Sequence, residues 1–294
     1  MPAYKDQHWL PSAYLKYFSV DQQNCSSKTS KVWRFDGQTM RCVPVSSQCS
    51  ADYHYSKEQA AETEQMFQKR ENIYCRILDQ VRVGQEVSER SMGDLFLCMF
   101  DLYLRNDVHK NRTGKEGVEA YNHRIETFLS KILLGRDDGA LQKADIIEHI
   151  KHCWRLEIIT VASDQQFVTS DNPSIWTAVR KPSNNLKPEL HLITLPLTPR
   201  HIAVAFDRRT LEIVNKPATV GDTHTFNIGQ IECAQRCVYM SRCLTEQDIV
   251  TAQNHFGRKS PTLCEVNETG WRLMLQYLPP EHHFSFMRSR PPLM

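Results

Sequence analysis

Two glutamates and an arginine in the N-terminal half of the chain have the types and spacing of a polar site. Glu64 and Glu71 are seven residues apart, close to two helical turns, so they share a helix face with Phe67 and Tyr74. An unpaired carboxylate on a buried face is costly, so each one needs a cation, a hydrogen-bond donor or a metal ion. Arg105, at the end of the next apolar segment, is the expected partner.

Two interpretations of this group are open. In the first, it is a structural ion pair that fixes the packing of two helices. In the second, Glu64, Glu71 and Arg105 are catalytic groups on the floor of a polar pocket. Replacing Arg105 with alanine distinguishes them, because the variant unfolds if the pair is structural and stays folded but inactive if the pocket is functional.

Arg105 and His109 form a second candidate pair, in the stretch "RNDVH". It is similar to the Arg and His pair of metal-independent RNases in HEPN-type domains, where both residues act at the scissile phosphate. An imidazole transfers protons near neutral pH, and a guanidinium can hold a phosphate through two bonds. Only three residues separate the two here, fewer than that pattern needs, so the alternative for His109 is a solvent-exposed loop histidine.

The stretch "TSDNPSIW" places Ser170, Asp171 and Asn172 at a strand end, where Pro173 disfavours helix in the residue before it. In one interpretation Asp171 caps backbone amides in an Asx-type turn. In the other, the three side chains face the pocket, Asp171 as a catalytic residue and Ser170 and Asn172 as binding residues. Asp171 could then bind a divalent metal ion, which is the one cofactor that the sequence suggests.

Three further residues are candidates for binding. Asn227 and Arg236 recur with Gln230 at roughly helical spacing, so they either point toward the same pocket or form the polar face of a helix. His8 either reaches the pocket or makes a hydrogen bond to a backbone carbonyl.

The motifs of several common enzyme classes are absent. His149 and His152 lie beside Cys153, but the H-E-x-x-H arrangement of zinc hydrolases is missing. The phosphate-binding and dinucleotide-binding glycine loops and the serine-hydrolase elbow are missing as well. The ten cysteines contain no C-x-x-C pair and, without an export signal, are expected to be thiols.

Composition indicates a soluble, cytoplasmic protein that does not enter membranes. The chain has 294 residues, with 36 Lys plus Arg against 34 Asp plus Glu, so its net charge of +2 gives no overall attraction to nucleic acid or to anionic lipid. The mean hydropathy is −0.50, and no window is apolar over the roughly 20 residues of a membrane helix. The N-terminus lacks the basic start and unbroken apolar run of an export signal.

The expected elements divide into a helical part and a later sheet. Asp36-Gly37 in "VWRFDG" predicts a hairpin turn. Hydrophobic periodicity predicts helices over 55–81, with Ser56 as the N-cap, and over 92–106, 118–134 and 141–154. Five β-branched runs between 156 and 206 predict a mostly antiparallel sheet, and two more helices are expected over 225–241 and 246–256.

This order predicts an α+β fold, in which an N-terminal β-hairpin and a helical bundle pack with the sheet. Trp9, Tyr14, Leu15 and Phe18 predict that the N-terminus is docked on the core rather than frayed. We expect one domain over 1–294, made of a docking segment and hairpin (1–56), a helical part (57–155), the sheet (156–215), C-terminal helices (222–258) and a loose tail (280–294).

Short motifs along most of the chain resemble a known family. They are, in order, His8, Pro11, Tyr14, Leu15 and Phe18, then "VWRFD", "YHYS", Glu64 and Glu71, Arg105, "FVTSDNP", "LPLTP", and finally Asn227 and Arg236. This order resembles the bacterial domain of unknown function 4238. The resemblance implies a stand-alone soluble protein, and such proteins occur among antiviral defence genes.

Two functions are compatible with these patterns. The first is an antiviral-defence effector that acts on nucleic acid, and if it is an enzyme it is a nuclease. Its residues around one cavity are Glu64, Glu71, Arg105 and Asp171. The second is a non-catalytic sensor that binds a small ligand or a phage protein there. A cluster of Arg and Lys at the rim of the cavity favours the first, and an apolar closed pocket with no basic approach favours the second. The sequence predicts no oligomeric state.

Overall fold

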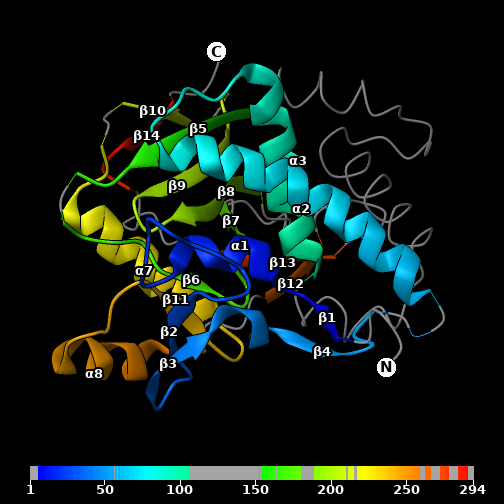
Figure 1. Ribbon diagram of the computed structural model, residues 1–294. Helices are drawn as coiled ribbons and strands as arrows, with labels where there is room; N and C mark the ends of the chain where they lie inside the picture. The colour runs from blue at the N-terminus through cyan, green and yellow to red at the C-terminus, as the bar shows by residue number, and fades with distance from the viewer. Residues whose placement is uncertain are drawn as a thin grey trace.

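The chain folds as α+β, with helices packed on mostly antiparallel sheets, as the sequence predicts (Figure 1). The structure is a computed structural model. It describes residues 6–55, 57, 59–105, 152, 154–162, 164–179, 189–209, 211–214, 217–258, 262–265, 272–277 and 284–290.

The N-terminal segment is docked on the core, which confirms the prediction from its aromatic residues. It contains β1 (Asp6–His8), α1 (Ser12–Leu15) and a 3-10 turn, η1 (Lys16–Phe18). The Tyr14 hydroxyl donates to the carbonyl of Pro196 at 2.6 Å, deep in the later sheet. The large apolar side chains of the segment are all buried: Trp9, Leu10, Tyr14, Leu15, Tyr17 and Phe18.

The predicted hairpin forms from β2 (Lys31–Phe35) and β3 (Met40–Pro44). Asp36 Oδ1 accepts the amides of Gln38 and Thr39 at 3.2 and 2.8 Å, and Gly37 takes the positive φ of 88° that the turn requires. The chain then runs through η2 (Val45–Ser47) to β4 (Ser50–Asp52), which pairs antiparallel with β1.

Two long helices follow, α2 (Ala60–Arg82) and α3 (Glu89–Arg105), and they pack against each other. The second half of α3 is buried, as its apolar sequence predicts. The prediction that α2 begins after Ser56 is wrong, because α2 starts at Ala60. The Tyr55 amide donates to Gln7 Oε1 at 2.7 Å, so the chain there is tied to the N-terminal segment and cannot yet turn into a helix.

The predicted helix over 118–134 lies outside the residues that the structure describes. The same holds for nearly all of the helix expected over 141–154, whose last residue, Trp154, begins a strand instead.

The later strands form a six-stranded sheet in the order β12-β13-β7-β8-β9-β5. Its neighbours pair antiparallel except β13 and β7, which are parallel. The register shifts at Pro196, which has no amide to donate. The strand bounds are β5 (Trp154–Thr160), β7 (Ile175–Val179), β8 (Glu189–Thr198), β9 (His201–Asp207), β12 (Thr262–Glu265) and β13 (Arg272–Tyr277).

The helix expected over 225–241 is wrong in its second half. Helix α7 (Val220–Cys233) ends early, and β11 (Val238–Met240) enters a four-stranded sheet in the order β3-β2-β11-β6, with β6 (Thr169–Ser170) at the other side. This central strand position outweighs the local helical pattern. Helix α8 (Glu246–His255) forms as predicted and lies beside the hairpin (Figure 1), where Phe256 meets Phe35 edge-on at 5.7 Å.

The C-terminal segment is not loose over the residues that the structure describes. Strand β10 (Leu211–Ile213) pairs with β14 (Met287–Ser289), and Phe286 and Met287 are buried. The expectation of a loose tail over 280–294 is therefore wrong for 284–290, because these apolar side chains join a core cluster with Phe226. None of the described helices is both long enough and apolar enough to cross a membrane.

Candidate functional site

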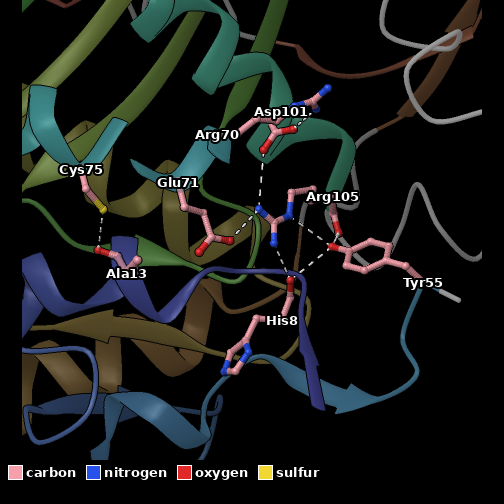
Figure 2. A network of polar contacts seen from close by, with 8 residues as sticks. All are labelled: His8, Ala13, Tyr55, Arg70, Glu71, Cys75, Asp101 and Arg105. Atoms are coloured by element: carbon pink, nitrogen blue, oxygen red, sulfur yellow. Dashed lines mark hydrogen bonds and ion pairs between the residues drawn. The ribbon is translucent and has the colours of Figure 1, made fainter. Parts of the chain in front are cut away.

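Arg105 is the centre of a buried polar network between α2, α3 and β1 (Figure 2). It ends α3, where the helix dipole favours a cation. Its Nη1 donates to Glu71 Oε1 at 3.1 Å, and its Nη2 donates to the backbone carbonyl of His8 at 2.7 Å. Its Nε donates to the Tyr55 hydroxyl at 3.4 Å. With an exposure of 1%, Arg105 joins three segments that are far apart in the sequence.

Asp101 connects a second arginine to this network. It lies one turn before Arg105, with its Oδ2 3.6 Å from Arg105 Nη1, and its Oδ1 accepts from Arg70 Nη1 at 2.5 Å. Burial acts to lower the pKa of Arg105, but the negative groups around it, Glu71 and Asp101 among them, raise that pKa well above its ordinary value. The buried guanidinium therefore stays charged.

The Arg105 guanidinium also packs on aromatic rings. Its centre lies 3.8 Å from the Phe67 ring centre and 5.9 Å from that of Tyr55. Phe67 lies between Glu64 and Glu71 on α2, so the stripe inferred from the sequence does bring carboxylates and an aromatic ring to the arginine. The expected pairing of Glu71 with Arg105 is confirmed.

Glu64 lies in the same region, but it is not bonded in the same way. Its side chain is half-buried, and its carboxylate makes no hydrogen bond or ion pair to any residue that the structure describes. Burial raises the pKa of Glu64, nearby Arg105 opposes this, and the negative charges of Glu71 and Asp6 raise the pKa further. Glu64 is therefore a carboxyl group within electrostatic reach of Arg105, which attracts its negative charge, and of Glu71, which repels it, and it forms no ion pair with Arg105.

Two buried hydroxyls on α2 also lack hydrogen-bond partners among the described residues. They are Tyr74 Oη and Thr63 Oγ1, and both side chains are at least 95% buried. Burial raises the pKa of Tyr74, and the nearby charge of Glu71 raises it further, which places this hydroxyl beside the network. Buried polar atoms are usually paired, so an unpaired one needs an explanation.

Among the residues that the structure describes, the balance of charge in this cluster is negative. Three carboxylates, of Glu64, Glu71 and Asp101, face the two guanidiniums of Arg70 and Arg105. Such an environment attracts a cation or a proton and repels a phosphate. We call these five residues, together with Tyr74, the acidic cluster.

Asp171 lies in a separate group of contacts. Its exposure is 2%, and its two oxygens accept the backbone amides of Gln235 and Arg236 at 2.9 and 2.8 Å. Burial raises the pKa of Asp171 to about 6, although the amide bonds act to lower it. This is the amide-capping arrangement, made across the fold to the turn between α7 and β11.

Ser170 and Asn172 lie in the same buried turn. The Ser170 hydroxyl is 2.9 Å from Gln230 Oε1 and 3.0 Å from the Asn172 carbonyl. Gln230 in turn donates from Nε2 to the Pro173 carbonyl at 2.9 Å. These bonds join α7 to the strand end, and Asn172 is almost fully buried.

Asn227 makes a second link between α7 and this strand. Its Nδ2 donates to the Gln166 carbonyl at 2.8 Å, and its Oδ1 accepts the Val168 amide at 2.9 Å. The Asn227 side chain thus satisfies backbone hydrogen bonds just before β6 that a neighbouring strand would otherwise make.

Arg236 and His8 also differ from the expected arrangement. Arg236 lies beyond the end of α7, exposed, with its guanidinium 5.0 Å from the centre of the Trp9 ring. It was expected on the helix, but the chain leaves the helix at Cys233 to reach β11. The His8 ring is 3.3 Å from the Ser46 carbonyl, as the alternative interpretation expects, and only its backbone carbonyl takes part in the Arg105 network.

The predicted residues therefore fall into two groups. Glu64, Glu71 and Arg105 come together, whereas no contact between described residues joins Asp171 directly to any of the three. The expected single cavity is not assembled by these contacts. His109 lies outside the residues that the structure describes.

Sequence reasoning missed Tyr55, Arg70 and Asp101. Asp101 had a visible signal, since it is a charge inside an apolar helix and four residues before Arg105. Tyr55 gave no such signal, because its role depends on the fold around it.

No arrangement of three or more His, Cys, Asp or Glu side chains suited to a metal ion occurs within the described ranges. The expected divalent ion therefore has no set of ligands among these residues.

One comparison with known proteins gives a match. The model of the family described as "Protein of unknown function (DUF4238)" matches residues 6–242, which is most of the chain. The comparisons with curated proteins and with solved structures give no match to this chain. The matched range contains the N-terminal segment and both groups of predicted residues, the one around Arg105 and the one around Asp171. The chain belongs to the DUF4238 family.

Proposed function

We propose that this protein is a non-catalytic binding module, a sensor that takes up a positively charged group of its ligand at Glu64 and Glu71. The observation that carries the proposal is the state of Glu64. This carboxyl is half-buried, has no hydrogen bond or ion pair to a described residue, and has a raised pKa beside the charge of Glu71. A carboxylate in such a place gains free energy when it pairs with a cation.

The charge balance of the acidic cluster supports the same ligand class. One added cation would match three carboxylates with three positive charges. The acceptors that a ligand can reach are the carboxylates of Glu64, which is half-buried, and Glu71, whose side chain keeps 22% exposure. Guanidinium and ammonium groups carry several donors and suit two such carboxylates.

Action on nucleic acid has less support. Arg105 is the residue that would hold a phosphate, but it is buried and gives its donors to Glu71, His8 and Tyr55. The net negative charge around it opposes the approach of a phosphodiester. The resemblance implies a protein of a bacterial family that occurs among antiviral defence genes. In that setting, the cationic group would belong to a phage protein.

The first test is a calorimetric titration of the purified protein with arginine amide and with a tetra-arginine peptide. We expect saturable binding that weakens with salt, for arginine amide near the millimolar range, or about 4 kcal/mol. Glu64→Gln should weaken binding about tenfold because it removes the unpaired charge. Glu62→Gln, an exposed change on the same helix, is the matched control and should leave the affinity unchanged.

Two results would overturn this proposal. One is the absence of saturable binding, or equal affinity in the Glu64→Gln variant. The other is cleavage of total cellular RNA or of DNA, with or without EDTA, that is lost on Glu64→Gln. That outcome would establish an effector acting on nucleic acid.

A further inference from the structure

The N-terminal strand is held at its end by two arginines. We call residues 6–9 the N-terminal latch. It pairs with β4 through three residues, and the Trp9 amide extends the pairing to the Cys49 carbonyl at 2.9 Å. The His8 carbonyl accepts from Arg105 at 2.7 Å, and the next ring, Trp9, lies 5.0 Å from the Arg236 guanidinium.

A column of aromatic rings connects these two arginines. Ring centres are 4.9 Å apart between Trp9 and His54, and 4.7 Å apart between His54 and Tyr55. The next pair, Tyr55 with Phe67, is also separated by 4.7 Å, and Phe67 lies under Arg105. The latch is thus attached to α2 and α3 by side-chain packing as well as by hydrogen bonds.

Tyr55 fastens the latch at the same point as Arg105. Its hydroxyl lies 3.4 Å from the His8 carbonyl, 3.3 Å from the Arg105 carbonyl and 3.4 Å from Arg105 Nε. The His8 carbonyl therefore meets two donors, Arg105 Nη2 at 2.7 Å and the Tyr55 hydroxyl, whose one proton is shared with the Arg105 carbonyl (Figure 2). The shorter of the two bonds depends on the position of the Arg105 side chain.

Glu71 belongs to both the latch and the proposed ligand site. Its carboxylate pairs with Arg105 at 3.1 Å, and its side chain keeps 22% exposure, so a ligand can reach it. A cation bound between Glu64 and Glu71 competes with Arg105 for that carboxylate. The other described ion pair of Arg105 Nη1 is to Asp101, 3.6 Å away on the side of α3, so the guanidinium is drawn there when Glu71 is lost.

We propose that a cationic ligand at Glu64 and Glu71 draws Glu71 away from Arg105 and thereby releases the N-terminal latch. This inference rests on the proposed function and adds the structural change by which the protein would signal that the ligand is bound. The bound and free states differ in the contacts of one guanidinium, which is the differential interaction that a ligand needs to shift an equilibrium. By linkage, a change that loosens the latch raises the affinity for the ligand, and a change that stabilises the latch lowers that affinity.

The test is hydrogen exchange of the full chain, read by mass spectrometry, with and without saturating tetra-arginine peptide. Amides in residues 6–10 should exchange about fivefold faster or more with the peptide, a coupling of the usual size. Amides of α7 should not change.

Tyr55→Phe provides the reciprocal arm of the test. It removes the hydroxyl at the latch without touching Glu64 or Glu71. It should speed exchange in residues 6–10 without ligand and should tighten peptide binding roughly three- to tenfold, the effect of one lost hydrogen bond. Tyr53→Phe, two residues away, is the matched control and should change neither quantity. A purely structural Tyr55 would leave the affinity unchanged.

The outcomes separate the two proposals. If the peptide binds in a Glu64-dependent way but exchange and the Tyr55→Phe affinity stay constant, the latch is refuted and the binding function stands. If the peptide does not bind, the binding function fails, and with it release by ligand. Glu71→Gln then tests the physical link by itself, since unchanged exchange in residues 6–10 would refute any control of the latch by Glu71.

Discussion

At the scale of single residues, Asp171 combines a raised pKa with a structural bond to two backbone amides. Its pKa is raised to about 6 by burial, a property that active sites often have. Both of its oxygens, however, accept backbone amides, from Gln235 and Arg236. The sequence showed an Asp-Asn-Pro turn, but it could not show amides more than sixty residues away.

Asp171 gives a prediction of pH dependence. Its folded pKa of about 6 lies above the ordinary value of 3.8, so the folded state binds this proton more tightly than the unfolded state. The stabilising contribution of the protonated group is complete below pH 4 and is lost as the pH rises through about 6, by about 3 kcal/mol at most. Urea unfolding between pH 3.5 and 7.5 measures it. Asp171→Asn should flatten this part of the profile, and an identical profile in the variant would contradict the assignment.

Gly37 gives a prediction about the hairpin turn. Its φ is +88°, and an added Cβ would lie 2.7 Å from Phe256 Cδ1. We expect Gly37→Ala to lower the free energy of unfolding by about 1 to 3 kcal/mol, from backbone strain and the displaced ring. Gly93→Ala is the control, since that α3 position has no neighbour within 4 Å; it should be neutral or stabilising by up to about 1 kcal/mol. Equal losses in both variants would disprove this account.

At the scale of elements, Arg105 joins α3 to α2 and to β1. The sequence predicted the pairing with Glu71 because helical spacing placed carboxylates on an apolar face. It could not predict the His8 carbonyl as a partner, because a backbone acceptor has no signature of its own. The early end of α7 was hidden for a similar reason, since the position of β11 between β2 and β6 is set by distant strands.

Arg105→Ala tests the structural contribution of this junction. The change leaves Glu71 and Asp101 without a shared guanidinium and removes a donor from the His8 carbonyl. We expect a loss of about 3 to 5 kcal/mol in the free energy of unfolding, as for other broken buried pairs. Arg76→Ala, an exposed arginine on α2, should stay within about 0.5 kcal/mol. Wild-type stability in the Arg105→Ala variant would show that the pair is not structural.

At the scale of the whole molecule, the class of the fold was predictable and its assembly was not. Helical and strand patterns are segregated along the chain, which predicts α+β. The order of the strands is decided by long-range pairing, such as the parallel contact of β13 with β7. The family match ends at residue 242, yet β14 pairs with β10 inside the matched range. Strands after residue 242 therefore pair with strands of the matched range, β14 with β10 in a two-stranded sheet and β13 with β7 in the six-stranded sheet.

The predicted site is divided in two because of how the N-terminal segment packs. The docked N-terminal segment separates the contacts of Asp171 from those of Arg105, with Trp9 near Arg236 and the His8 carbonyl at Arg105. Periodicity places residues on faces, but it does not say which faces meet.

The most direct measurement for the central claim is the affinity of the tetra-arginine peptide for the wild-type chain and for the Glu64→Gln and Glu62→Gln variants. We expect the first and third to bind equally and Glu64→Gln to bind about tenfold more weakly. Equal affinity in all three, or no binding in any, would contradict the assignment of Glu64 as the receptor of a cation.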